Sequence, residues 1–197
     1  KVTTHTELLP APLQAANAEL GSWLKRTLEE RGISIFEWGT GPWKTFNHLL
    51  TEVAEGEIQL GIVDGTIRRI CSVLRIDVRY HSTDQELKLF ESEQIFADGR
   101  RRERPTPFAI WEKLKVGEVP DDAVERAVKE ELGIEGKVNA SYLSRETIDE
   151  PPFDFPGLPS QVFAIDFKVY LTDDQFCPEG YVETQKDKKT FFRWKAI

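Results

Sequence analysis

Alternation of apolar and polar residues marks the middle and C-terminal parts of the chain as β-rich. Over residues 74–80 and again over 163–171, apolar side chains occupy every second position, as in a sheet with one buried face. Asp64 with Gly65, and Asp98 with Gly99, stand between strand-like runs and predict hairpins. We therefore expect strands over residues 58–63, 66–80, 86–97, 100–104, 138–144, 163–171 and 190–194.

The N-terminal part carries a helical period instead. Apolar residues recur at helical spacing over residues 13–31, and Gly32 follows as a stop signal. Gly21 is a weak helix former, so this helix is expected either as one piece or as two. A second helix is expected over residues 42–54 with Gly56 as its C-terminal cap, and a short apolar strand over 33–38.

A third helix is expected within residues 117–134. Pro120 suits the first helical position, two aspartates follow it, and Gly133 suits a left-handed C-terminal cap. Val124, Val128 and Leu132 recur every four residues and predict a buried stripe. The remaining surface of this helix is acidic.

This segment resembles the signature of the Nudix hydrolases, G-x5-E-x7-R-E-U-x-E-E-x-G-U, where U is aliphatic. Seven positions match in register: Glu118, Arg126, Val128, Glu130, Glu131, Gly133 and Ile134. Two positions depart from the signature, because Glu112 stands at the opening glycine and Ala127 at the glutamate after the arginine. The motif is therefore degenerate.

The resemblance implies an α/β (α+β) fold with a Nudix-like mixed sheet sandwiched between helices. On this basis residues 61–197 form the Nudix-like domain, and residues 1–60 form a helical N-terminal extension that packs on it or builds a partner surface. A homodimer through the N-terminal helices is compatible with this organisation.

The resemblance also implies a site. Glutamates at positions i, i+3 and i+4 share one helical face and can hold divalent cations, but position i is Ala127 here. Glu130 and Glu131 are the expected principal metal ligands, Glu118 is a supporting ligand, and Arg126 orients the cluster. Members of the family often recruit a further carboxylate from a late loop, and Glu183 or Glu179 would supply it. The implied cofactor is Mg, or Mn.

Two further groups are candidate substrate contacts. If residues 100–104 are extended, then Arg100, Arg102 and Arg104 share one side and are suited to grip phosphate oxygens. The alternative is a charged edge strand that resists aggregation. In the proline-rich segment 148–160, Phe153 and Phe155 are candidates for stacking on a base, or else they pin the loop to the core.

Composition limits the class of protein. Of the 197 residues 40% are hydrophobic and 30% are charged, with a net charge of -8, so general nucleic-acid binding is not expected. No membrane span or signal peptide is evident, and the two cysteines have no metal-type spacing. We expect a cytoplasmic or organellar protein, with any transit peptide removed, that is not secreted.

Two functions follow from the resemblance. The first is a divergent Nudix-type pyrophosphohydrolase that acts with Mg on a nucleoside diphosphate linked to another moiety. The alternative is a catalytically silent Nudix-like domain that binds a nucleotide, an RNA or a protein. Ala127 and Glu112 favour the second function, whereas the retained Glu118, Arg126, Glu130 and Glu131 favour the first.

Overall fold

A computed structural model describes residues 5–12, 16–103 and 106–197. The chain divides into two compact units, and each is described separately. The first comprises residues 1–72, 113–117 and 146–163; the second comprises 73–112, 118–145 and 164–197. The expected N-terminal extension over residues 1–60 lies wholly within the first unit. No helix in the described part of the chain is long and apolar enough to span a membrane.

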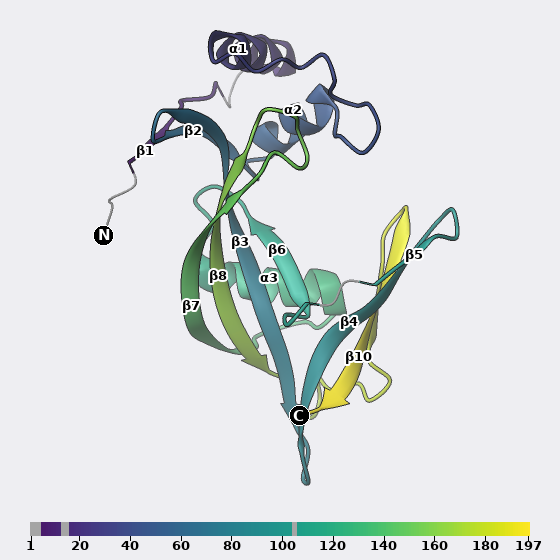
Figure 1. Cartoon of the computed structure of the whole chain (residues 1–197). Helices are drawn as coiled ribbons and strands as arrows, with labels where there is room; N and C mark the ends of the chain where they lie inside the picture. The colour runs from purple at the N-terminus through teal and green to yellow at the C-terminus, as the bar shows by residue number, and fades with distance from the viewer. Residues whose placement is uncertain (1–4, 13–15, 104–105) are drawn as a thin grey trace. The chain divides into compact units, whose positions relative to one another are not determined.

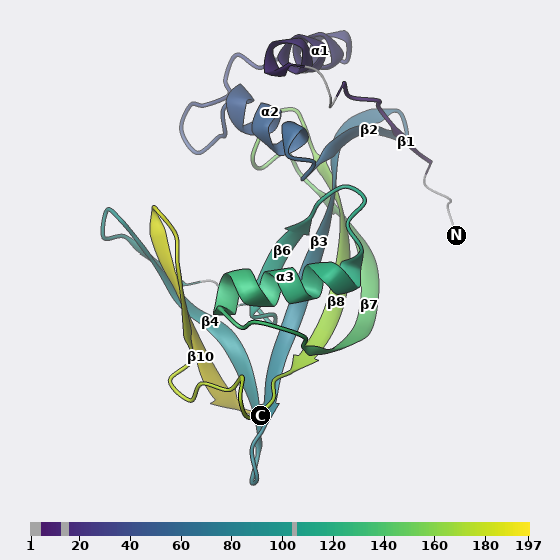
Figure 2. The same ribbon diagram turned by 180° about the vertical axis from the view of Figure 1, so that it is seen from behind.

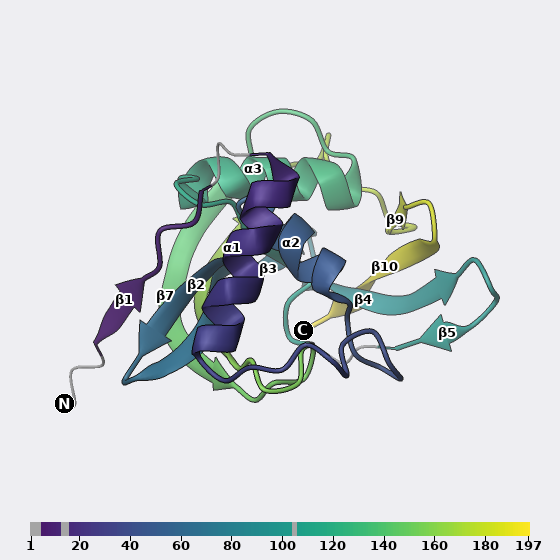
Figure 3. The ribbon, with the colours of Figure 1, turned by 90° about the horizontal axis from the view of Figure 1, so that it is seen from above.

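The first unit places two helices against a short antiparallel sheet. Its elements are β1 (Thr6–Leu8), α1 (Asn17–Glu30), α2 (Phe46–Ala54), β2 (Gln59–Val63) and the first part of β3 (Thr66–His81). It also contains the last residues of β6 (Ile110–Leu114) and β7 (Asn139–Glu150) and the first residues of β8 (Ser160–Tyr170). β1 pairs with β2, and β2 pairs with β3 through a hairpin at Asp64 and Gly65. Both hairpin residues have positive φ, 48° and 81°, as the Asp-Gly pair predicts. Figure 3 shows α1 and α2 side by side above β2.

The core of the first unit is built by the apolar stripes of both helices. Leu20, Leu24 and Leu28 of α1 are buried with Leu49 and Val53 of α2. α1 is continuous through Gly21, so the chain forms one helix there and not two pieces.

A capping box fixes the start of α2. The Thr45 hydroxyl accepts from the His48 N–H, while the His48 ring accepts from the Thr45 N–H. The helix therefore begins at Phe46, later than the predicted residue 42.

A charged network lies inside this unit, around Glu52 of α2. Its carboxylate, whose side chain is only 9% exposed, accepts from Arg69 at 2.7 Å, Lys44 at 2.9 Å and Lys113 at 3.2 Å. Burial alone would raise the pKa of Glu52, but the three cations outweigh it and lower the pKa to about 2. The network therefore requires an ionised Glu52.

The second unit is a larger sheet with one helix. Its helix is α3 (Pro120–Leu132), and its complete strands are β4 (Glu86–Phe96), β5 (Arg101–Arg102), β9 (Tyr181–Thr184) and β10 (Lys188–Ala196). It also contains the rest of β3 and parts of three further strands: β6 (Ile110–Leu114) as far as Glu112, β7 (Asn139–Glu150) as far as Arg145, and β8 (Ser160–Tyr170) from Ala164 onwards. The antiparallel order β3-β4-β10-β9 runs through it, and β5 pairs with the other end of β4. Figures 1 and 2 show α3 crossing one face of these strands. The predicted α+β class and large sheet with helices are confirmed.

Local signals give α3 its bounds. Pro120 begins the helix, Asp121 and Asp122 lie in its first turn, and Gly133 caps it in the left-handed conformation at φ 70°. The buried stripe comprises Ala123, Val124, Ala127, Val128 and Leu132. The helix predicted from the motif is confirmed.

Some predicted elements are wrong. Residues 33–38 form no strand, because their backbone is used by turn hydrogen bonds such as Trp38 N–H to Ile35 C=O. Three short strands were not predicted: β1, β6 and β9. They have only three to five residues each, so none of them offers enough alternation to be recognised.

We predict that the first unit is acid-sensitive through Glu52. Because the folded pKa of Glu52 lies below its usual 4.5, its contribution is complete above about pH 5 and is lost as the pH falls towards 2. That contribution is on the order of 3 kcal/mol. Urea unfolding between pH 6 and 3 should show a smaller loss of stability for Glu52→Gln than for the wild type. The exposed neighbour variant Glu55→Gln should retain the wild-type profile; equal profiles for all three proteins would contradict the prediction.

Candidate functional site

The acidic site of the second unit is organised by Arg126 of α3. Its guanidinium donates to both carboxylate oxygens of Glu118, at 2.7 and 3.0 Å. It also donates through Nη1 to Glu112 and to Glu130, each at 2.8 Å. The hydrogen bonds to Glu118, and then that to Glu112, raise the pKa of Arg126 above its ordinary value. One cation thereby holds three carboxylates from β6, from the segment before α3, and from α3 itself.

Glu131 lies in a different environment from its neighbour Glu130. Burial, and after it the nearby carboxylates of Glu183 and Glu112, raise the pKa of Glu131 to about 8 against the opposing effect of Lys188. A hydrogen bond between the side chains of Glu131 and Glu183 adds to the same shift. The raised pKa favours the protonated form of Glu131 beside Glu183 of β9.

The two departures from the signature concern the same guanidinium. Ala127 is fully buried in the stripe of α3 and offers no carboxylate. Glu112, at the position of the lost glycine, is in β6 and is bonded to Arg126. Compared with the signature, the chain therefore lacks the carboxylate at position 127, next to Arg126 in sequence. It has gained the carboxylate of Glu112, which forms an ion pair with Arg126.

The carboxylates of this site do not form a ready-made metal cluster. Among the described residues, no three His, Cys, Asp or Glu side chains are arranged to hold a metal ion. Of the expected ligands Glu130, Glu131 and Glu118, two are bonded to Arg126, which leaves Glu131 with Glu183. Magnesium commonly uses only one or two protein carboxylates, and waters and substrate phosphates complete its shell. A proton-sharing pair of glutamates fits that kind of ion.

Of the two late-loop candidates, Glu183 is the one beside α3. The structure places it in β9, paired with Thr190 of β10. Glu179 is exposed and accepts from the Cys177 thiol instead. The sequence analysis treated Glu112 only as the loss of a glycine and missed its bond to Arg126. A signal was present in the sequence, because one carboxylate is lost at Ala127 while another is gained at Glu112.

The arginine group is described only in part. Arg100 is bonded to Asp98 at 2.7 Å, and Arg102 donates to the Gln94 side-chain oxygen at 2.7 Å. Both guanidinium groups lie over the Phe96 ring, at 5.0 and 5.7 Å from its centroid. These two arginines therefore share a neighbour, whereas Arg104 lies outside the described residues.

The aromatic pair of the first unit separates into one exposed and one core residue. Phe153 is 72% exposed. Phe155 cannot stack on a substrate in this structure, because its side chain is fully buried against Trp38 and beneath Arg69. It pins the loop to the core, which was the alternative prediction for aromatic residues beside prolines.

Comparisons with known proteins give structural matches only. No family profile matches the chain, and no curated protein matches it. Similar solved structures include the Ap4A hydrolase of C. elegans, with 15% identity, 62% of this chain and 80% of that chain covered, and a TM-score of 0.33. A MutT/nudix family protein of Enterococcus faecalis has 16% identity, coverage of 92% and 56%, and a TM-score of 0.41.

A third match is the NUDIX domain of Shewanella oneidensis NrtR in complex with ADP ribose, with 10% identity, coverage of 64% and 71%, and a TM-score of 0.33. Two of these three structures, the MutT/nudix family protein and the NUDIX domain, bear the name of the family that the sequence resembles. At such identities and TM-scores they carry no argument about activity.

The raised pKa of Glu131 predicts a pH dependence of stability. Between about pH 4.5 and 8 the folded chain holds a proton that the unfolded chain releases, so stability should fall as the pH rises through this window. The contribution to the slope is at most about 1.4 kcal/mol per pH unit. Urea unfolding in metal-free buffers at pH 5, 6, 7 and 8 should show this fall in the free energy of unfolding for the wild type and for Glu130→Gln. It should be absent from Glu131→Gln; an unchanged slope in that variant would contradict the assignment.

Proposed function

We propose that the chain is a divergent Nudix-type pyrophosphohydrolase that acts with Mg, or Mn, on a nucleoside diphosphate linked to another moiety. The observation that supports this most is the pair of Glu131 and Glu183, two carboxylates that approach closely enough to share a proton. A divalent ion is a natural replacement for that proton. The substrate class is inferred from the resemblance of the retained residues to the Nudix signature.

The chain's own residues divide the work. Glu131 and Glu183 would hold the ion, and Arg126 fixes the acidic surroundings through Glu118, Glu112 and Glu130. When bound, a divalent ion stabilises charge on phosphate oxygens and activates water. Because Arg126 engages Glu118 on both oxygens, Glu118 acts here as a positioning residue for Arg126, and Glu130 remains exposed beside the ion pair.

A silent binding module is the second candidate. The buried methyl group of Ala127 favours it, because that position lies one helical turn before Glu131 and has no carboxylate to offer. Such a module would bind the same class of diphosphate ligand without cleaving it.

Hydrolysis can be tested directly. With millimolar Mg and a panel of diphosphate-linked nucleotides, the wild type should release nucleoside monophosphate. We expect Glu131→Gln and Glu183→Gln to lower turnover by roughly 100-fold or more, as for the loss of a group acting on the reacting phosphate. Glu125→Gln, on an exposed position of the same helix, is the matched control and should remain active. Folded wild-type protein without turnover on any substrate would contradict the enzyme and favour the binding module.

Restoring the absent carboxylate tests where the ion binds. Ala127→Glu places a side chain on the helical face of Glu131, and with saturating Mg its turnover should rise at least several-fold if the ion binds at Glu131. Without Mg the variant should be destabilised, because the position is fully buried. Ala123→Glu is the matched control, since Ala123 is equally buried on the same helix. It should be destabilised with or without Mg and should gain no activity; equal behaviour of the two variants would exclude the proposed location of the ion.

A further inference from the structure

The strands β4, β10 and β9 carry apolar and basic side chains together on one face. Val182 of β9 pairs with Phe191 of β10, and Ile95 of β4 pairs with Lys189 of β10. Directly paired residues of antiparallel strands point to the same face, and so do residues two apart along one strand. These four side chains therefore lie on one surface, which we call the outer face.

The outer face is the side of these strands that points away from α3. Thr190 lies between Lys189 and Phe191 and therefore points the opposite way. Its paired residue Glu183 meets Glu131 of α3, and Thr190 itself is only 2% exposed. α3 is the only helix in the described part of the second unit, so no helix of this unit covers the outer face.

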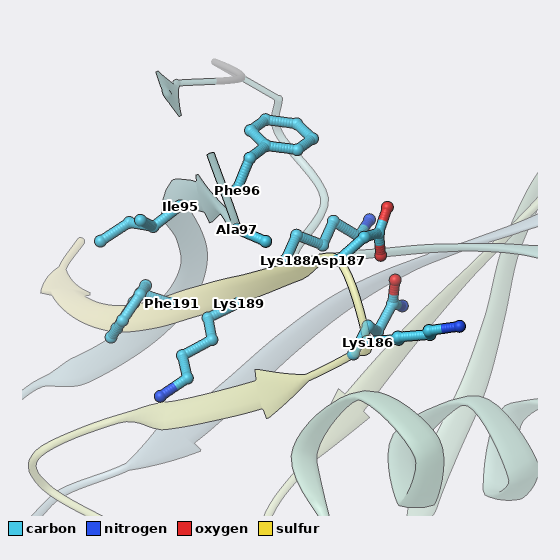
Figure 4. A pocket seen from close by; sticks show the side chains of 9 residues that line it. Ile95, Phe96, Ala97, Lys186, Asp187, Lys188, Lys189 and Phe191 are labelled. Atoms are coloured by element: carbon cyan, nitrogen blue, oxygen red, sulfur yellow. The ribbon is translucent and has the colours of Figure 1, made fainter. Parts of the chain in front are cut away.

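Apolar side chains of the outer face remain in contact with water. Val182 is 50% exposed, and Ile95 and Phe191 are partly exposed. A cavity of about 440 Å³ adjoins them at the turn between β9 and β10, which is within the size range of binding pockets. It is lined by Ile95, Phe96, Ala97, Phe191 and residues 185–189. Figure 4 shows these side chains, with the lysines extending from the turn and from the start of β10.

The cations of this surface are not neutralised by carboxylates. Lys186 and Lys189 are exposed and form no ion pair with a described residue. Arg193 lies two residues after Phe191 and places its guanidinium 5.9 Å from the centre of that ring. Its hydrogen bonds within the described part of the chain go to backbone oxygens. Three positive charges therefore surround the exposed apolar residues.

Acidic residues offset little of this charge. Glu93 pairs with Phe191 and so lies on the outer face, but its carboxylate is bonded to Arg101 at 3.1 Å. Asp187 is the acidic residue among those that line the cavity. Positive charge thus predominates locally in a chain whose net charge is -8, and such a surface is complementary to an acidic partner.

The apolar residues favour a peptide over a nucleic acid as that partner. Single-stranded nucleic acids bind mainly by stacking their bases on aromatic rings, whereas Ile95 and Val182 are aliphatic and suit the apolar side chains of a protein. The net charge of -8 also opposes the approach of a long polyanion. A short segment with few carboxylates meets less of this repulsion.

We infer that the outer face docks an acidic segment of a partner protein. One large apolar side chain of that segment enters the cavity beside Ile95 and Phe191, as a buried anchor does in other interfaces. Carboxylates on either side of the anchor meet Lys186 and Lys189. The inference is independent of the proposed function, because the carboxylate of Glu183 lies on the opposite face of the sheet.

Selection from a random library of displayed peptides tests the chemistry of the partner without assuming its sequence. The wild type should enrich peptides in which acidic residues flank a large apolar residue. The double variant Lys186→Glu, Lys189→Glu should enrich basic flanks instead, because like charges across an interface are strongly disfavoured. The control Lys129→Glu, Lys137→Glu makes the same change in net charge at exposed positions and should keep the wild-type preference. No enrichment by the wild type, or one preference in all three proteins, would overturn the inference.

The affinity of one enriched acidic peptide, measured by fluorescence anisotropy, separates the two contributions. The lysine double variant should bind it about tenfold more weakly at low salt, and this difference should shrink at high salt. Val182→Ser should weaken binding several-fold at either salt concentration, because it removes apolar contact area. Leu143→Ser is the matched control, since Leu143 is 45% exposed in β7 of the same unit, and it should bind as the wild type does. Equal affinities for the Val182→Ser and Leu143→Ser variants would contradict docking on the outer face.

Two other occupants of the outer face would give different results. An oligo-dT strand should bind more weakly than the enriched peptide; tighter binding that is lost in the lysine double variant would overturn the inference in favour of a nucleic acid. Sedimentation should show no self-association that depends on this face. A wild-type dimer that dissociates in Val182→Ser would overturn the inference in favour of a second copy of the chain.

Discussion

The guanidinium of Arg126 is the interaction on which the acidic site depends. Glu112, Glu118 and Glu130 come from three different segments, and their like charges would repel each other without a cation among them. One arginine offers enough donors in a planar fork to serve all three. The adjacent Glu131 lies beside other carboxylates, chiefly Glu183, and its burial together with these charges raises its pKa.

Two glutamates, one in each unit, illustrate the same constraint with opposite results. Glu52 is surrounded by Arg69, Lys44 and Lys113, and its pKa falls to about 2. Glu131 is half-buried beside other carboxylates, and its pKa rises to about 8. A buried charge persists only when it is paired. Glu52 is paired within the protein and is structural, whereas Glu131 meets Glu183 and needs a proton or a cation from outside.

Much of the fold was predictable because local signals agree with the final structure. The Asp-Gly hairpin at Asp64, the Pro120 start and Gly133 end of α3, and the alternation of β8 all depend on residues close in sequence. The short strands β1, β6 and β9 were missed, since pairing with distant strands determines them more than their own pattern does.

The residues that α3 contributes to the candidate site were predictable from the sequence, whereas the residues from other segments that contact them were not. The motif named Arg126 and Glu131, and the family resemblance offered Glu183 as one of two late carboxylates. That Glu112 bonds to Arg126 depends on how β6 lies beside α3, which no spacing along the chain specifies. The burial of Phe155 likewise depends on Trp38, far away in sequence.

The most direct test of the account is the number of protons released when Mg binds, measured by calorimetry at pH 7 in buffers that differ in ionisation enthalpy. If the Glu131 and Glu183 pair exchanges its shared proton for the cation, the wild type should release close to one proton per bound ion. Glu131→Gln should release none and bind Mg more weakly. Mg binding without proton release, or with equal release in Glu131→Gln, would contradict the account.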